Sequence, residues 1–440
     1  MSIRTLIILF AGLVAGPLTA AAESLTLARA EELALQNHPR VSAAQLQALA
    51  SREATAQVRS AFFPTLVANA TAVGVDREGN RITAGALNNP SVFDRNGDGL
   101  VLNQLITDFG RTANLTKGAE FRSRAREQDA LTARARVLLV VSESYFGALE
   151  AQAVLRVAGQ TVATYQLIYD QVFELARNKI KSDLDVSFAR VSLEQGRILQ
   201  VKAQNDVNAA FTTLADALGS REEQRFELIE EALPATNVMD GAALVQQALA
   251  SRPELAALRY ERDASRRQFR AERDANYPTI SAIAVAGITP VRDALLNDDH
   301  YAAAGVNLSL PIFAGGLYKS RQNEADFQAR RAEETLRDAE NDVVRDVRVA
   351  ALNANYALER MGLTAKLAQS ASEAFELAQA RYQTGVGSIV ELSQAQLNRT
   401  AAEIDETNAK YQYQIQRAAL DYQTGRLAVG AAGLTGATRR

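Results

Sequence analysis

The sequence predicts a mainly α-helical fold with a small antiparallel β part, built from two copies of one structural half. Three observations support this fold class. Pro39 and Pro64 recur 214 residues later as Pro253 and Pro278, with the same spacing of 25 in each pair. Two stretches of 68 residues contain no proline and keep a helical pattern, and four shorter segments are suited to strands. A repeat this long exceeds the ~20–50 residues of a solenoid unit, so each half contributes the same elements to one assembly.

The composition excludes several function classes. The chain has 48 basic and 51 acidic residues, so its formal charge of −3 gives no basic surface for nucleic acid. The absence of cysteine excludes disulfides, a lipoprotein anchor and thiol metal sites, and the chain has only two histidines. Nothing resembles a nucleophile–base–acid set. The sequence therefore predicts no catalytic residue, no metal site and no cofactor.

Residues 1–22 are predicted to be a signal peptide. Arg4 supplies the positive charge, Leu6 to Val14 the apolar core, and Ala20 to Ala22 a small-residue cleavage site. The apolar run is too short to span about 30 Å of hydrocarbon. No later stretch is expected to match the ~20 apolar residues of a membrane helix, so any membrane-spanning part must be a closed β-barrel.

Each half is predicted to follow one plan, in a first repeat at 23–236 and a second at 237–426, before a flexible tail at 427–440. Short helices are expected at about 42–60 and 254–275, because proline costs nothing near a first helical turn and the next proline ends the helical run. The predicted strands cover 65–75, 100–109, 279–288 and 303–313. The loops between the paired strands cover 76–99 and 289–300.

The segment 303–313 shows the clearest alternation. Ala304, Val306 and Leu308 lie on one expected face, and Gly305 and Asn307 lie on the other. This pattern is typical of a transmembrane barrel strand, although one such strand also fits a half-buried soluble sheet. Ten residues at ~3.3 Å each and a tilt of ~45° suffice to cross a bilayer.

The two uninterrupted stretches, 111–178 and 317–384, are predicted to be helices of ~100 Å. The second has an apolar period of 3.5 residues, which indicates coiled-coil packing. Return helices are expected to run back to Gly219 and Gly425, where glycine can stop a helix. One chain then supplies four helical rods and four strands. Because the smallest single-chain barrels have about eight strands, membrane-spanning strands would require an oligomer.

The turns between long and return helices are predicted to differ. Gly385 and Gly387 can take the left-handed conformation before a capping box at Ser388–Glu391. The matching box in the first half, Ser182–Asp185, has no glycine before it, so Asn178 or Lys179 must take the turn. Between the shared Phe-Glu-Leu-Ala motif and its box, the first half is four residues shorter, which is one helical turn.

This plan resembles the TolC-type outer-membrane channel family, the outer-membrane factors of efflux and type I secretion systems. The resemblance covers nearly all of residues 25–426. It is carried by Leu27 to Pro39, by the two Pro-Thr-hydrophobic strand starts, by Leu310 to Gly316, and by Arg381 to Gly385 running into Ser388 to Leu392.

The resemblance implies a homotrimer in the outer membrane that extends into the periplasm. Three chains would pool four strands each into a 12-stranded transmembrane β-barrel, and their coiled-coil helices would form a periplasmic α-barrel. The implied function is a passive exit duct of a tripartite efflux pump or type I secretion system. Its implied partners are a periplasmic adaptor (membrane fusion protein), an inner-membrane transporter of the RND, ABC or MFS type, and outer-membrane lipid. Neither the cargo nor the pump class follows from the sequence.

A periplasmic coiled-coil adaptor or envelope structural protein is the alternative. Adaptors also contain helical hairpins, but they have one central hairpin flanked by lipoyl-type β modules. This chain instead predicts two hairpins and two pairs of strands. A soluble monomer obtained without detergent would favour the alternative.

The resemblance also implies gate residues. Glu391 matches an acidic ring that narrows the periplasmic entrance, and Gln394 takes the place of a second acidic residue. Arg381 and Tyr382 match residues that tie neighbouring helices together, and Asp185 matches their partner. The alternative role of Asp185 and Glu391 is to cap their helices, worth ~1 kcal/mol each.

The turn tips Lys179-Ile180 and Gly385-Val386-Gly387 are the implied adaptor-docking surface. The family usually has glycine where Lys179 stands, so the geometry of the first tip is expected to differ.

Residues 94–99 match the start of a calcium-binding loop. The twelfth position is Leu105 instead of glutamate, and no helices are expected on either side. Residues 94–99 are therefore predicted to form turns in an external loop.

Overall fold

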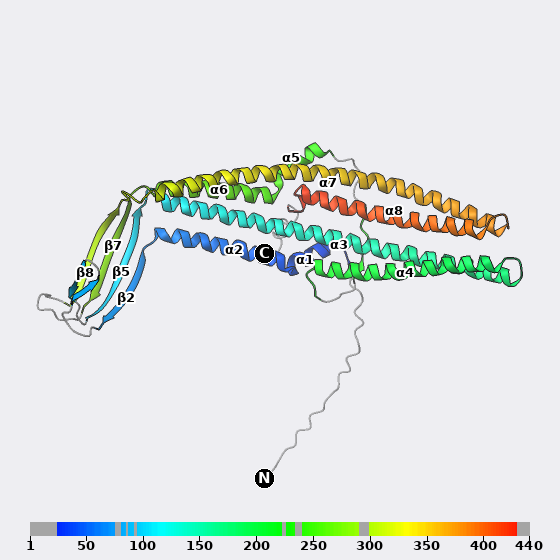
Figure 1. Ribbon diagram of the computed structural model, residues 1–440, viewed down its shortest axis with the longest axis horizontal. Coiled ribbons are helices and arrows are strands. Elements are labelled where there is room, and N and C mark those ends of the chain that lie inside the picture. Colours follow the sequence, from blue (N-terminus) through cyan, green and yellow to red (C-terminus); the bar gives the residue numbers. More distant parts are fainter. Residues whose placement is uncertain are drawn as a thin grey trace, which may run out of the picture. The chain divides into compact units, whose positions relative to one another are not determined.

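The structure is a computed structural model that describes residues 24–74, 81–84, 87–91, 95–221, 226–233, 240–289 and 299–428 (Figure 1). The predicted signal peptide and most of the predicted tail lie outside these residues. The fold is mostly helical with a small antiparallel sheet, as predicted. The chain divides into two compact units, each of which takes residues from both predicted repeats. The sheet unit comprises 39–136, 239–352 and 419–440, and the tip unit comprises 1–38, 137–238 and 353–418.

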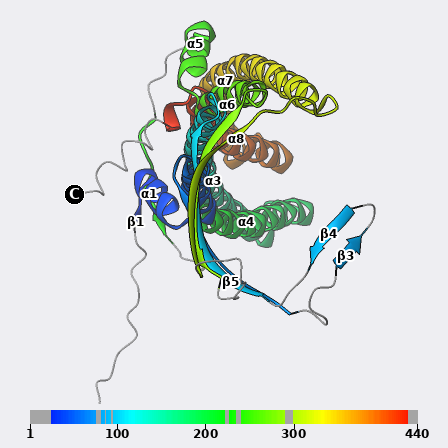
Figure 2. The same ribbon diagram turned by 90° about the vertical axis from the view of Figure 1, so that its left-hand side faces the viewer.

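A four-stranded antiparallel sheet forms one end of the sheet unit. Its strands are β2 (Thr65–Val73), β5 (Arg95–Thr107), β7 (Thr279–Ile288) and β8 (His300–Ser309), in the spatial order β2-β5-β7-β8. All three pairings are antiparallel. Strands β3 (Arg81–Ala84) and β4 (Leu87–Ser91) form a separate hairpin, which Figure 2 shows standing apart from the curved sheet.

Two strands begin earlier than the sequence predicts. Strand β8 starts at His300, and β5 starts at Arg95. The calcium-like run was wrongly placed in a loop, because residues 95–99 pair with residues 69–73 of β2 and continue the ladder. The predicted loop 76–99 also contains β3 and β4. Local turn-forming residues did not end β5, because a partner strand was available to accept its backbone hydrogen bonds.

The register gives the sheet two chemically different faces, since directly opposed residues share a face. One face is mainly apolar, with the polar residues Asn96, Asp98 and His300 towards its outer end and Gln104 towards the helices. That apolar face carries Leu66, Ala68, Leu100, Leu102, Ala282, Ala284, Ala286, Ala302, Ala304 and Val306. The mixed face carries Val67, Asn69, Gly99, Val101, Asn103, Ile283, Val285, Gly287, Tyr301, Ala303, Gly305 and Asn307.

The helices of the sheet unit confirm the role of the repeated prolines. Helix α2 (Pro39–Arg59) and helix α6 (Pro253–Asp274) both begin at proline, slightly before the predicted starts. A 3₁₀ turn at Ser60–Phe62 leads from α2 towards Pro64. Helix α5 (Gly241–Ser251) was not predicted. It packs with α6 and α7 around a small core of Val245, Ala248, Leu255, Leu336, Val343 and Val347.

The long helices are confirmed. Helix α3 (Arg111–Arg177) and helix α7 (Leu317–Gln383) each contain 67 residues, and both run from the sheet unit into the tip unit. The return helices are α4 (Asp183–Ala217) and α8 (Ile389–Gln423). Gly219 and Gly425 follow them with φ of 75° and 77°, so both glycines stop their helices in the left-handed conformation.

The tip unit contains three elements that sequence reasoning missed. Helix α1 (Leu27–Asn37) precedes α2, and the short strands β1 (Ser24–Leu25) and β6 (Glu227–Leu228) pair in parallel. Tyr145 of α3 is fully buried, and its hydroxyl lies 2.8 Å from the Leu25 carbonyl oxygen and 2.6 Å from that of Ile229. This long-range anchor explains why two-residue strands persist.

One prediction about membrane helices was wrong. An 18-residue window of α3 has a mean hydropathy of 1.3, which is apolar enough for a membrane span by length and composition. Half of that window is buried. Buried core helices meet the same criterion, and α3 places Leu138, Val141 and Tyr145 in the interior.

Candidate functional site

The candidate site is the end of the tip unit where α3 turns into α4 and α7 turns into α8. Its core is contributed by all four helices: Ile168, Val172, Ala189, Phe375, Tyr382, Ile389 and Leu392. Both hairpins therefore share one apolar cluster immediately behind their turns, and this cluster fixes the position of the polar residues around it.

The first turn is made by Lys179. Its φ of 58° is in the left-handed region, which ordinarily favours glycine, so Lys179 takes the turn and Asn178 does not. The Lys179 amide donates to the Ala176 carbonyl at 2.8 Å, and the Ile180 amide donates to the Leu175 carbonyl at 2.9 Å. Ile180 is 66 % exposed at the tip.

The second turn uses glycine as predicted, although of its two glycines only Gly385 takes the left-handed conformation. Gly385 has a φ of 78°, and the Val386 and Gly387 amides donate to the Arg381 carbonyl at 3.0 and 2.8 Å. A β-carbon at Gly387 would lie 3.1 Å from Arg381 backbone and side-chain atoms. Val386 is 71 % exposed, so each turn presents one aliphatic side chain.

Asp185 forms the predicted capping box in full. The Asp185 amide donates to the Ser182 hydroxyl oxygen at 3.2 Å, and the Ser182 amide donates back to the Asp185 carboxylate at 3.0 Å. The carboxylate therefore satisfies the start of α4.

Glu391 departs from its predicted capping box. Its amide donates to the Ser388 hydroxyl oxygen at 3.1 Å, but its carboxylate accepts from Arg381 Nε at 3.0 Å. Only half of the box forms, because the guanidinium on α7 is within reach. Both side chains of this ion pair are about half exposed. The side-chain amide nitrogen (Nε2) of Gln394, one turn further, donates to the Asn398 side-chain oxygen (Oδ1) at 2.9 Å.

Tyr382 lies in a different environment from its neighbour Arg381. It is 6 % exposed, and its hydroxyl has no hydrogen-bond partner among the described residues. Burial, and then the charge of Asp185, raise the pKa of this hydroxyl. The Lys181 ammonium lies 4.3 Å from the ring centroid in a cation–π contact that sequence reasoning missed. The only sequence signal was a basic residue in the first turn.

The structure thus separates the predicted gate residues into two groups. Arg381, Glu391 and Gln394 line a groove of about 820 Å³ along α7 and α8, together with Asn398 and Asp405. Tyr382 and Asp185 lie near one another on the side of the first turn. Within one chain, Arg381 pairs with Glu391 of its own hairpin. The predicted tie of Arg381 and Tyr382 to Asp185 stays a prediction.

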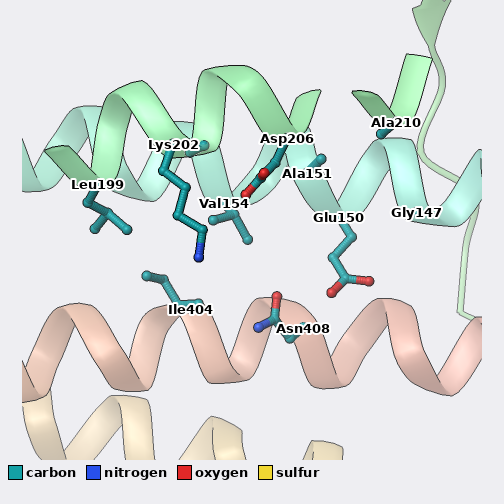
Figure 3. A pocket seen from close by; sticks show the side chains of 11 residues that line it. Gly147, Glu150, Ala151, Val154, Leu199, Lys202, Asp206, Ala210, Ile404 and Asn408 are labelled. Atoms are coloured by element: carbon teal, nitrogen blue, oxygen red, sulfur yellow. The ribbon is translucent and has the colours of Figure 1, made fainter. Parts of the chain in front are cut away.

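A second polar cavity in the tip unit was not predicted. It measures about 380 Å³ between α3, α4 and α8, and Figure 3 shows Lys202, Glu150 and Asn408 directed into it. Burial raises the pKa of the Glu150 carboxyl, although a hydrogen bond from Gln412 at 3.3 Å opposes the shift. Among the residues that the structure describes, no group of histidine and acidic side chains could hold a metal ion.

A small antiparallel sheet with one mainly apolar face and two long helical hairpins are the features of an outer-membrane channel. Within that class, the chain belongs to the outer membrane efflux protein family, whose family model matches residues 31–220 and 244–426.

Known proteins support this assignment. The outer membrane protein TolC of Salmonella enteritidis is 25 % identical over 343 residues, or 74 % of this chain and 68 % of that protein. The alkaline protease secretion protein AprF of Pseudomonas aeruginosa is 26 % identical, over 72 % of this chain and 67 % of that protein. A crystal structure of a membrane protein from Pseudomonas aeruginosa has the same fold, with a TM-score of 0.80 and 24 % identity over 92 % of this chain and 91 % of that one.

The chain is therefore an outer-membrane efflux channel. Its family is one of transport channels and not of enzymes. The recognition made from sequence motifs is confirmed.

Proposed function

We propose that three copies of the chain form a passive duct with a 12-stranded transmembrane β-barrel. The observation that carries the proposal is the four-stranded sheet. Its outer strands β2 and β8 each leave one edge unpaired among the described residues, and one of its faces is mainly apolar. Four strands are too few to close, whereas twelve enclose an aqueous lumen. The apolar face then contacts lipid, and the mixed face lines the lumen.

Aromatic side chains support the position of the membrane boundary. Each of the four strand ends nearest the helices is followed or preceded by an aromatic residue that is at least half exposed. These residues are Phe63, Phe109, Tyr277 and Phe313. Transmembrane barrels carry aromatic girdles at their interfaces, so these four residues mark the periplasmic boundary of the bilayer.

The helices supply a second argument for assembly. Helix α4 exposes Leu184, Phe188, Val191, Ile198 and Val201, which recur at spacings of three, four and seven residues. In the tip unit, α7 exposes Tyr356, Leu363, Leu367 and Leu377, at spacings of seven, four and ten residues. Exposed apolar rows of this length need a partner helix. Neighbouring copies would cover them by coiled-coil packing in a periplasmic α-barrel.

The tips would act as the gate and the docking surface. Around a three-fold axis, the Arg381–Glu391 pairs and Gln394 would line the entrance, and Tyr382 with Asp185 would hold the first turn against the second hairpin. The exposed Ile180 and Val386, with Lys179, Gly385 and Gly387, would contact a periplasmic adaptor fed by an inner-membrane transporter. Opening requires that the adaptor bind the open state more tightly than the closed one.

Cross-linking tests the trimer. The natural chain has no cysteine, so only introduced thiols react. We combine Ala68→Cys on β2 with Ala302→Cys, Ala304→Cys or Val306→Cys on β8 and oxidise intact outer membranes. At least one pair should give covalent dimers and trimers, because β2 of one copy lies beside β8 of the next.

The matched control combines Ala68→Cys with Ala284→Cys on β7, which is paired on both sides within the chain. This control should stay monomeric. Monomers from every β2–β8 pair, or a ladder that continues beyond trimers, would contradict the closed three-chain barrel.

A further inference from the structure

Tyr301 lies across two glycines on the mixed face of the sheet. It is directly opposite Gly287, which is directly opposite Gly99, so the three residues form one row over β8, β7 and β5. A β-carbon at Gly99 would lie 2.5 Å from the Tyr301 hydroxyl oxygen. A β-carbon at Gly287 would overlap the same hydroxyl and the Asp98 carbonyl oxygen. The outer part of the ring therefore occupies space that only glycine leaves free.

This row lies far from the helices. Strand β7 follows α6 and ends at Ile288, and β8 begins at His300 and runs back towards α7. Tyr301 is therefore at the outer end of the strands, opposite the aromatic girdle. Other glycines on the same face behave differently, because a β-carbon at Gly97 or Gly305 would meet nothing within 4 Å.

We infer that Tyr301 determines the width of the duct near its extracellular mouth, and that Gly99 and Gly287 keep it wide by letting the ring lie flat. This inference rests on the proposed function, in which the mixed face lines the lumen. Tyr301 is 45 % exposed in the single chain. A methyl group at Gly99 would push the hydroxyl end away from the wall, and three-fold symmetry would repeat the obstruction three times. Tyr301 is thus a residue that sets the size limit for cargo.

Thiol labelling of whole cells tests the inference without depending on the periplasmic tip. Asn307→Cys places a single thiol on the mixed face, six residues inward from Tyr301 along β8. In this background, a small charged maleimide and a bulky polyethylene-glycol maleimide are added from outside. Gly99→Ala should slow labelling by the bulky reagent several-fold and leave labelling by the small reagent unchanged.

Three further variants make the result specific. Gly99→Ala combined with Tyr301→Ala should restore bulky labelling, because the obstructing ring is gone. Gly97→Ala and Gly305→Ala should match the background, since their β-carbons meet nothing. If Gly99→Ala labels as fast as Gly97→Ala, the inference is wrong and the duct is unaffected. If even the small reagent fails to label Asn307→Cys, the mixed face does not line the lumen. That result would contradict the proposed barrel as well as the inference.

Discussion

At the residue scale, the carboxylates at matching positions of the two predicted capping boxes bind different partners. Asp185 closes its box, whereas Glu391 turns to Arg381 at 3.0 Å. The position seven residues before the capping serine is Leu175 in the first half and Arg381 in the second. A leucine offers the carboxylate nothing, while a guanidinium competes with the helix N–H groups through a charge-assisted bond. The sequence predicted the spacing of both capping boxes. It could not predict this competition, which depends on the distance between Arg381 and Glu391 across the turn.

The Arg381–Glu391 pair gives a prediction about ion selectivity. Arg381→Leu should free a ring of carboxylates and shift the reversal potential in planar bilayers towards cation selectivity. Glu391→Gln should free the guanidinium groups and shift it in the opposite direction. Arg337→Leu is the control, because Arg337 pairs with Glu334 at similar exposure on α7 outside the tip unit. Unchanged reversal potentials in both tip variants would show that Arg381 and Glu391 do not line the pore.

A second residue-scale prediction concerns pH. Burial, and then the charge of Glu231, raise the pKa of Glu31 on α1 to about 7. The folded state therefore favours neutral Glu31, and this stabilisation is complete below about pH 4.5 and is lost as pH rises through 7. Because Glu31 is partly accessible, Glu31→Gln should stabilise the protein by only ~1–2 kcal/mol at pH 8 and hardly at all at pH 4.5.

Thermal unfolding in detergent at the two pH values measures this effect. Glu32→Gln is the matched control, because Glu32 is exposed and paired with Arg29 at 2.7 Å. Equal effects of Glu31→Gln at both pH values would show that its carboxyl is already charged in the folded protein.

At the element scale, the two turns close the same kind of hairpin with different residues. Lys179 and Gly385 both take a positive φ, at 58° and 78°. A side chain in this region costs ~1 kcal/mol relative to glycine. The sequence correctly located both turns, because glycine, serine and acidic residues mark helix ends locally. The predicted loss of one helical turn above the first turn is not seen as a shorter helix, since α3 and α7 both contain 67 residues.

Exchanging the turn residues tests that cost. Lys179→Gly should slow hydrogen exchange of the Ile180 amide by ~5-fold, and Gly385→Lys should accelerate exchange of the Val386 amide to a similar extent. Both amides donate to a carbonyl of the preceding long helix, so they report on the turn itself. Exchange resolved by mass spectrometry measures the change. If Gly385→Lys leaves the exchange rate of the Val386 amide unchanged, a side chain at this left-handed position does not strain the turn.

Other elements show where sequence reasoning stops. Strand β7 was predicted with its observed ends, because Pro278 fixes its start and an apolar run follows. Helices α1 and α5, and strands β1 and β6, were missed. Each is short, with 11 residues in α1 and in α5 and two residues in β1 and in β6. Strands β1 and β6 also depend on the Tyr145 hydroxyl, which lies 120 and 84 residues away from its two partners along the chain. Such tertiary contacts leave no periodic signal.

At the scale of the whole molecule, the duplication has a packing reason. A β-carbon at Gly219 would lie 2.9 Å from the His38 Cα atom, and one at Gly425 would lie 2.8 Å from the Ser251 hydroxyl oxygen. In both halves a return helix ends in glycine against the junction that leads into a proline-started helix. The repeated proline and glycine positions therefore preserve the same joint twice. The sequence showed the repetition, but only the structure shows the two positions in contact.

The exposed row on α4 gives the last prediction. Ile198 and Val201 are 70 % and 72 % exposed within one chain, yet a neighbouring copy should bury them. Replacing both with lysine would place two charges in that interface without removing any buried contact within the chain. The trimer fraction in detergent, measured by native mass spectrometry, should fall about tenfold or more, because each buried aliphatic side chain contributes ~1.5–3 kcal/mol. Gln204→Lys is the control, because Gln204 is exposed on the flank of the same helix. A double variant that remains fully trimeric would show that α4 faces solvent in the assembly, and the proposed ring of helices would need a different order.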